Sequence, residues 1–144
     1  MGEFALRGYN VALPEVDKGD DIFVVNDATG SLWRVQVKTS CEKRQKKSSR
    51  YGFRTRKASV TTIPVPDIAF VFVMRHKEIW RFCVIARAQL ETYRAAGHLT
   101  ESRDPKTGID FLQASLVLHD DGKALLAKQD VAKHMEDWTA WPVI

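Results

Sequence analysis

The segment "LWRVQVK", residues 32–38, alternates between two classes of side chain, and this alternation limits the fold more than any other feature of the sequence. Successive residues of a β-strand point to opposite faces of a sheet, so Trp33, Val35 and Val37 share one face and the even-numbered residues share the other. The apolar run "DIFVV" precedes this segment, and the intervening "NDATGS" has the composition of a hairpin loop. The pattern therefore predicts a β-hairpin.

The predicted hairpin carries a cluster of polar side chains. Asp21 begins its first strand, while Gln36 and Lys38 lie two apart on the second strand and share a face. The Asp21 carboxylate, the Gln36 amide and the main-chain carbonyl of Val37 offer hard oxygen ligands of the kind that Mg²⁺ accepts, with Mn²⁺ as an alternative. Lys38 could orient or deprotonate a water, or offset charge on a phosphate. We therefore expect Asp21, Gln36 and Val37 to bind a metal, and Asp21, Gln36 and Lys38 to be catalytic.

Asp20 is the alternative carboxylate for this site. A strand that begins at Asp21 turns Asp20 to the opposite face, so Asp21 is the preferred ligand. Taken alone, either aspartate also fits a solvated turn, and Lys38 alone fits an exposed strand lysine. The interpretation as a site therefore depends on their combination with Gln36 and with the basic segment that follows.

Positive charge is concentrated in one part of the chain. Residues 34–59 contain ten Lys or Arg and a single acidic residue, Glu42, whereas the remaining residues carry 12 basic and 17 acidic side chains. A local basic field favours binding to a polyanion. The residues that we expect to contact nucleic acid are Arg34, Lys43, Arg44, Lys46, Lys47, Arg50, Arg54 and Arg56. Tyr51 and Phe53 alternate with these arginines and fit either core packing or stacking on bases.

The other elements follow from shorter patterns. We expect a short strand at residues 9–14, an exposed loop at 41–50 and a strand from Tyr51 as far as Ile63. The two apolar runs of residues 68–74 and 78–86 predict a hairpin of central strands. The remaining expected elements are a short helix ending before Gly97, a loop at 99–110, a strand at 111–119 and a terminal helix at 130–141. This order indicates an α/β or α+β fold around a central mixed sheet flanked by helices.

"GDDIFVV" followed by "VQVKTS" resembles the signature of the PD-(D/E)XK nuclease superfamily, in its Gln-x-Lys variant known among small homing and restriction-type endonucleases. The paired apolar strands "IAFVFVM" and "IWRFCVIAR" after a basic segment add to the likeness, which covers residues 1–90. It implies a restriction-endonuclease-like sheet, a metal held by Asp21 and Gln36, and catalysis by Lys38. Such proteins usually have a long helix before the first strand, sometimes with a further acidic residue. Here that helix is shortened, and Glu3 is the only candidate.

Composition limits the remaining classes. A chain of 144 residues with 44% hydrophobic content is the size of one domain, residues 1–144, and no apolar run approaches the roughly 20 residues of a membrane helix. Without a signal-peptide pattern we expect a cytoplasmic protein. Cys41 and Cys83 lack a metal-binding spacing and are expected to be free thiols, and the four histidines are expected at the surface.

The expected function is a Mg²⁺-dependent endonuclease that hydrolyses DNA. Because one domain carries one active site and cutting a duplex requires two, we also expect a homodimer or higher oligomer. A non-catalytic nucleic-acid-binding module is the alternative, and a domain whose basic loop meets an acidic protein partner is a third.

Overall fold

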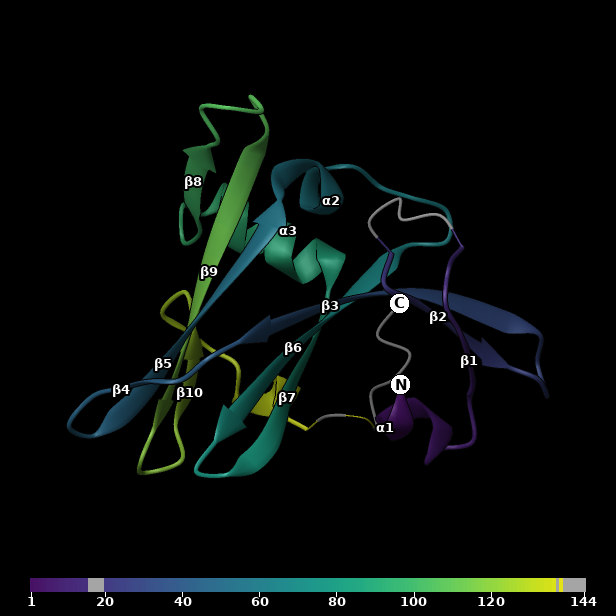
Figure 1. The fold of residues 1–144 in the computed structure, drawn as a ribbon, viewed down its shortest axis with the longest axis horizontal. Coiled ribbons are helices and arrows are strands. Elements are labelled where there is room, and N and C mark those ends of the chain that lie inside the picture. The colour runs from purple at the N-terminus through teal and green to yellow at the C-terminus, as the bar shows by residue number, and fades with distance from the viewer. Residues whose placement is uncertain (16–19, 137, 139–144) are drawn as a thin grey trace.

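Two β-sheets and a few short helices form the fold of this protein, for which a computed structural model describes residues 1–15, 20–136 and 138 (Figure 1). Sheet A has the strand order β1-β2-β3-β6-β7, and sheet B has the order β11-β10-β9-β5-β4. Strand β8 pairs with the first residues of β9, on the same side of β9 as β10. Only β3 and β6 pair in parallel among the described strands, so sheet A is mixed, as the sequence predicts.

The strands of sheet A are β1 (Asn10–Ala12), β2 (Ile22–Asn26), β3 (Ser31–Ser40), β6 (Ile68–His76) and β7 (Ile79–Ala86). The strands of sheet B are β4 (Lys43–Arg44), β5 (Ser48–Arg56), β8 (Thr100–Arg103), β9 (Asp110–His119), β10 (Ala124–Leu126) and β11 (Gln129–Asp130). The helices are α1 (Gly2–Ala5), α2 (Lys57–Thr61), α3 (Arg87–Ala95) and a 3-10 turn, η1 (Ala132–His134). Figure 1 shows α2 and α3 between the two sheets.

Two apolar clusters lie on the two faces of sheet A. The larger cluster fills the space between the sheets and includes Tyr51 and Phe53 of β5 together with Phe70 and Phe72 of β6. The aromatic pair of β5 therefore packs in the core and is not available to stack on bases. The smaller cluster covers the other face of sheet A, where Phe4 of α1 packs edge-on against Trp138 with ring centroids 5.2 Å apart.

The β2–β3 hairpin forms as predicted. Ile22 pairs with Val35 and Asn26 with Ser31, and alternate residues of β3 point to opposite faces. Val35 lies in the smaller cluster. Gln36 pairs with Phe70, whose side chain faces the space between the sheets, so Gln36 is directed to that side.

Several predicted elements are wrong in extent or type. The strand predicted from Tyr51 to Ile63 begins earlier, at Ser48, and gives way to α2 after Arg56. The predicted loop at 41–50 contains β4 and the start of β5, and the predicted loop at 99–110 contains β8. Of the two predicted central strands, β6 lies between β3 and β7, whereas β7 is the last strand in the order of sheet A.

The predicted terminal helix is also wrong over its described part. Gln129 and Asp130 form a strand with β10, and only one 3-10 turn follows. Val131 is fully buried and Met135 packs on the larger cluster, so these apolar residues cover the core although the segment that carries them is not an α-helix. Residues 137 and 139–141 of that prediction lie outside the described part of the chain.

Helix α3 ends where the sequence predicts. Gly97 has a φ of 74°, and the N–H of His98 donates to the carbonyl of Tyr93, which is the hydrogen-bond pattern of a glycine-terminated helix. At the other end of the helix, Arg87 is 6% exposed and donates to both carboxylate oxygens of Asp67 and to the carbonyl of Val60. This arginine therefore ties α3 to α2 and to the start of β6.

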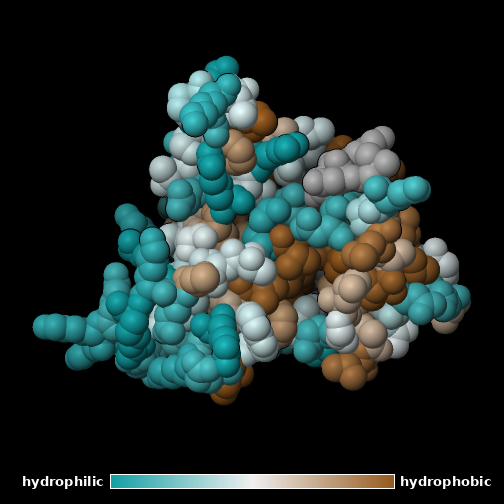
Figure 2. All heavy atoms as spheres, viewed as in Figure 1, coloured by the Kyte–Doolittle hydropathy of each residue, from teal (hydrophilic) through white to brown (hydrophobic). Residues whose placement is uncertain are grey.

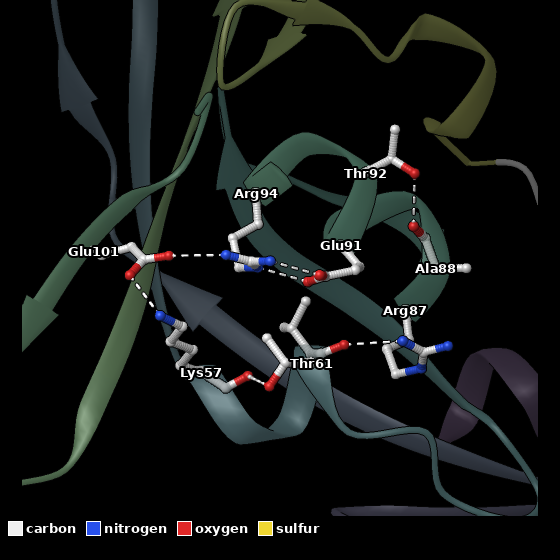
Figure 3. Close-up of polar contacts among 9 residues, drawn as sticks. Lys57, Thr61, Arg87, Ala88, Glu91, Thr92, Arg94 and Glu101 are labelled. Carbon is white, nitrogen blue, oxygen red and sulfur yellow. Dashed lines mark hydrogen bonds and ion pairs between the residues drawn. The ribbon is translucent and has the colours of Figure 1, made fainter. Parts of the chain in front are cut away.

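A network of ion pairs anchors β8 to the helices (Figure 3). Glu101 of β8 accepts hydrogen bonds from Lys57 of α2 at 2.7 Å and from Arg94 of α3 at 3.2 Å, and Arg94 also binds Glu91. These cations hold the pKa of the Glu101 carboxyl below its usual range. The exposed strand β8 thus has a fixed position beside β9.

Candidate active site

The candidate site lies where β2 begins and β3 continues past it. The N–H of Asp21 donates to the carbonyl of Val35 at 3.0 Å, so the ladder between the two strands ends at this point. Beyond it, β3 pairs with β6 only on its other side. The main-chain groups of Val37 that face the missing strand are therefore available to side chains or ligands.

Asp21 takes up one of these groups. Its Oδ2 atom accepts the N–H of Val37 at 2.6 Å. Because the N–H and C=O of a strand residue point to the same side, the carbonyl of Val37 is directed to the same edge. The Asp21 carboxylate and the Val37 carbonyl thus lie at the same unpaired edge of β3, beyond the end of β2.

Gln36 is held from the other sheet. Its side chain is 5% exposed, and its Oε1 atom accepts a hydrogen bond from the Thr55 hydroxyl of β5 at 3.0 Å. Thr55 is itself buried among the inward-facing residues of β5. The orientation of the amide is therefore determined by a contact between the two sheets.

Lys38 completes the group. Its Nζ atom lies 3.9 Å from Oδ2 of Asp21. A cavity of about 200 Å³ opens at this point, and its lining residues are Asp21, Gln36, Lys38, Arg54, Thr55, Arg56 and Phe111. The structure thus brings together the three side chains that the sequence singled out, with two arginines of the basic segment beside them.

Asp20 has a different environment. Its Oδ2 atom accepts hydrogen bonds from the Nε and Nη2 atoms of Arg34 at 3.0 and 2.7 Å, and both residues line a neighbouring cavity. Glu3 of α1 is also separate from the site. Its carboxylate binds Arg7, which follows this helix, and Phe4 of α1 packs on the opposite face of sheet A. Asp21 is the carboxylate that meets Gln36 and Lys38.

The basic residues fall into two groups. Arg34, Arg44 and Arg54 have acidic partners, which are Asp20, Asp120 and, at 3.9 Å, Asp104. The others are exposed and form no ion pair within the described residues: Lys43, Lys46, Lys47, Arg50 and Arg56. Most of this surface lies on β4 and β5, and the side of the molecule that carries these strands is hydrophilic in Figure 2. Of these five residues only Arg56 lines the cavity, and the other four lie toward the opposite end of β5, at its hairpin with β4.

The sequence interpretation missed two residues of the site. Thr55 follows from the alternation of "RTR", because an inward-facing threonine between two outward-facing arginines must meet the core or the opposite sheet. Phe111 lies under the guanidinium of Arg54, with 3.6 Å between Cζ and the ring centroid. No local signal predicts this contact, since it depends on the pairing of β5 with β9.

One of the four histidines is not at the surface. His76, at the end of β6, is 8% exposed, and its Nδ1 atom lies 3.0 Å from the hydroxyl of Tyr51. Burial lowers the pKa of His76, while Glu42 partly opposes this shift. Of the two thiols, Cys41 is exposed and Cys83 is buried, and burial raises the pKa of Cys83 to about 12.

The oxygen donors at the cavity and at the neighbouring edge of β3 fit a hard cation. Asp21, Gln36 and Val37 offer a carboxylate, an amide oxygen and a main-chain carbonyl, which is the ligand chemistry of Mg²⁺ rather than of zinc. In the described ranges, no three residues among His, Cys, Asp and Glu come close enough together to hold a metal. A single carboxylate is compatible with Mg²⁺, which keeps several waters and also takes phosphate oxygens.

The comparisons with known proteins give one informative result. No protein-family model and no curated protein matches the chain. Among solved structures, the bacterial homing endonuclease I-Ssp6803I matches 96% of this chain and 80% of its own length, with a TM-score of 0.52 and 18% sequence identity. No helix of the described residues is long and apolar enough to cross a membrane. The likeness is one of fold, and the protein has the mixed α+β architecture of a restriction-endonuclease-like domain.

Proposed function

We propose that this protein is a metal-dependent DNA endonuclease that hydrolyses phosphodiester bonds at the cavity between β3 and β5. The observation that carries this proposal is the meeting of Asp21, Gln36 and Lys38 at one cavity, with Arg54 and Arg56 at its border. The fold shared with a bacterial homing endonuclease supports it independently. Basic side chains without acidic partners, such as Arg50 and Lys47, would bind the phosphate backbone.

In the proposed site, Asp21, Gln36 and the Val37 carbonyl would hold Mg²⁺ or Mn²⁺. A bound divalent ion supplies an activated water and offsets charge on the phosphate. Lys38 directs a positive charge to the place where negative charge increases on the phosphate in the transition state. Thr55 fixes the amide of Gln36, and the hydrogen bond from Val37 fixes the carboxylate of Asp21. Arg56 would hold the DNA strand at the border of the cavity.

A nuclease that cuts both strands of a duplex needs two such sites, so we propose that the chain acts as a homodimer or higher oligomer. Strand β7 lies at the end of sheet A, and its residues Ile79 and Trp80 are 65% and 58% exposed. Large apolar side chains on such a strand suit a contact with a second copy. Sedimentation of the purified protein tests this, and a monomer at the concentrations that cleave DNA would contradict it.

A DNA-binding module without cleavage is the second candidate. It is favoured by one observation: Asp21 is the sole carboxylate among the residues that line the described cavity. Two measurements separate the candidates. The endonuclease cleaves plasmid DNA with Mg²⁺ or Mn²⁺ and loses this activity in Asp21→Ala, whereas the binding module retains the DNA and never nicks it. Absence of DNA binding at low salt would contradict both and favour an acidic protein partner.

A further inference from the structure

An exposed polar surface continues from the cavity across β5, β9 and β8. The strand registers set two cross-strand rows on it, Arg54–Gln113–Thr100 and Arg56–Phe111–Ser102. Directly opposite residues of antiparallel strands share a face, and so do residues two apart. The intervening Thr55 and Leu112 are buried, so the two rows lie on the outer face of sheet B. We call these six residues the outer face.

The outer face is fixed in position from behind. Glu101 lies between Thr100 and Ser102 on β8 and therefore points to the opposite side, where Lys57 and Arg94 bind its carboxylate (Figure 3). The two hydroxyl residues are left on the outer face. At its other edge, the stacking of Arg54 on Phe111 limits the freedom of that guanidinium.

Gln113 occupies a particular place on this face. The outward residues of β5 are Arg50, Gly52, Arg54 and Arg56, so Gly52 leaves a gap in a row of cations. A Cβ atom at Gly52 would lie 3.4 Å from Nε2 of Gln113, which shows that the Gln113 amide reaches over this gap. Unlike the arginines, an amide both donates and accepts hydrogen bonds. This is the pairing that recognises the N6 and N7 atoms of adenine in the major groove.

The outer face also fits the dimensions and charge of a DNA groove. The major groove admits a two-stranded β-ribbon. Residues two apart on a strand are about 6.6 Å apart, close to two base-pair steps of about 3.4 Å each. Arg54 and Arg56 line the cavity as well as the outer face, so a duplex held at the cavity would extend over Gln113. The occupant that this charge and continuity favour is double-stranded DNA.

We propose that the outer face reads the bases that flank the cut, with Gln113 as the residue that selects an adenine. This inference rests on the proposed function for the position of the scissile bond, and it adds the surface from which target choice comes. The arginines of the outer face contact phosphates and position the duplex, while the amide of Gln113 discriminates between bases.

A selection experiment tests this assignment. Each protein is mixed with a pool of duplexes of random sequence in the presence of Ca²⁺, and the bound DNA is sequenced. The proteins compared are wild type, Gln113→Ala, Gln113→Glu and Lys46→Ala. Wild type should prefer adenine at one position. Gln113→Ala should reduce that preference about tenfold without changing the others, and Gln113→Glu should shift it towards cytosine, whose N4 group is a donor. Lys46→Ala, the control, should weaken binding to all sequences alike.

The inference is overturned if the two Gln113 variants show the same base preferences as wild type at every position. It is also overturned if wild type selects no sequence. The proposed function has its own test. A protein that selects DNA through Gln113 but never cleaves it supports the inference and contradicts the nuclease. A protein that cleaves DNA with Mg²⁺ but shows no base preference supports the nuclease and contradicts the inference.

Discussion

At the scale of single residues, the hydroxyl of Thr55 orients the Gln36 amide that would bind the metal of the proposed site. Because Thr55 donates to Oε1 of Gln36, its loss removes a contact that orients the amide. Removing such a supporting contact typically costs 10- to 100-fold in metal affinity. Thr55→Val should therefore raise the Mg²⁺ concentration for half-maximal cleavage about tenfold, whereas Thr55→Ser should keep the wild-type value. An equal effect of both variants would mean that Thr55 serves packing alone.

His76 gives the protein a stability that depends on pH. Burial lowers the pKa of His76 in the folded protein below its ordinary value of 6.5, so the unfolded chain binds more protons as the solution becomes acidic. This contribution is present above pH 6.5 and is lost as the pH falls through the pKa of the folded state. Urea unfolding at pH 7.5 and pH 5.5 should show a smaller difference between the two conditions for His76→Gln than for wild type. Equal differences would contradict this role.

The sequence predicts that the three candidate residues meet, because they are close together along the chain. Asp21, Gln36 and Lys38 lie on two strands joined by a short loop, so hairpin geometry and alternation are enough to bring them together. The contacts of Phe111 and Gln113 depend instead on the pairing of β9 with β5, and these two strands are separated in the sequence by β6, β7, β8 and two helices. No local pattern carries that information.

At the scale of elements, Arg87 joins α3, α2 and the start of β6. Truncation leaves Asp67 and the carbonyl of Val60 without this buried donor, so Arg87→Ala should lower the free energy of unfolding by about 3 kcal/mol. Arg94→Ala is the matched control, because the side chains of its partners Glu91 and Glu101 remain 31% and 45% exposed and ion pairs near the surface contribute little. Denaturant titration measures both. A loss for Arg94→Ala as large as that for Arg87→Ala would contradict the assignment.

Elements with a clear period were predicted well, and those at the ends of sheets were not. The hairpin β2–β3 and helix α3 carry a hairpin loop and a terminal glycine that fix their limits. The segment from Gln129 to Glu136 has helical spacing, yet Val131 is used to close the larger cluster beside β10. Such tertiary contacts override local propensity, because burying an apolar side chain contributes about 1.5–3 kcal/mol.

At the scale of the whole molecule, two sheets meet at β3 and β5, and the candidate site lies at their junction. Sheet A supplies Asp21, Gln36 and Lys38, while sheet B supplies Thr55 and the arginines. The sequence predicted one mixed sheet and placed the basic residues of 41–50 in a loop. It could not show that β5 belongs to a second sheet, because the partner of β5 is a distant strand.

The most direct test of the account is cleavage of supercoiled plasmid DNA by the purified protein with Mg²⁺, compared with Lys38→Ala and with Lys133→Ala as a matched lysine variant that does not line the cavity. We predict nicking by wild type and Lys133→Ala, and a rate at least about 100-fold lower for Lys38→Ala with DNA binding retained. Equal rates for Lys38→Ala and wild type, or no cleavage by wild type with either Mg²⁺ or Mn²⁺, would contradict the proposed site.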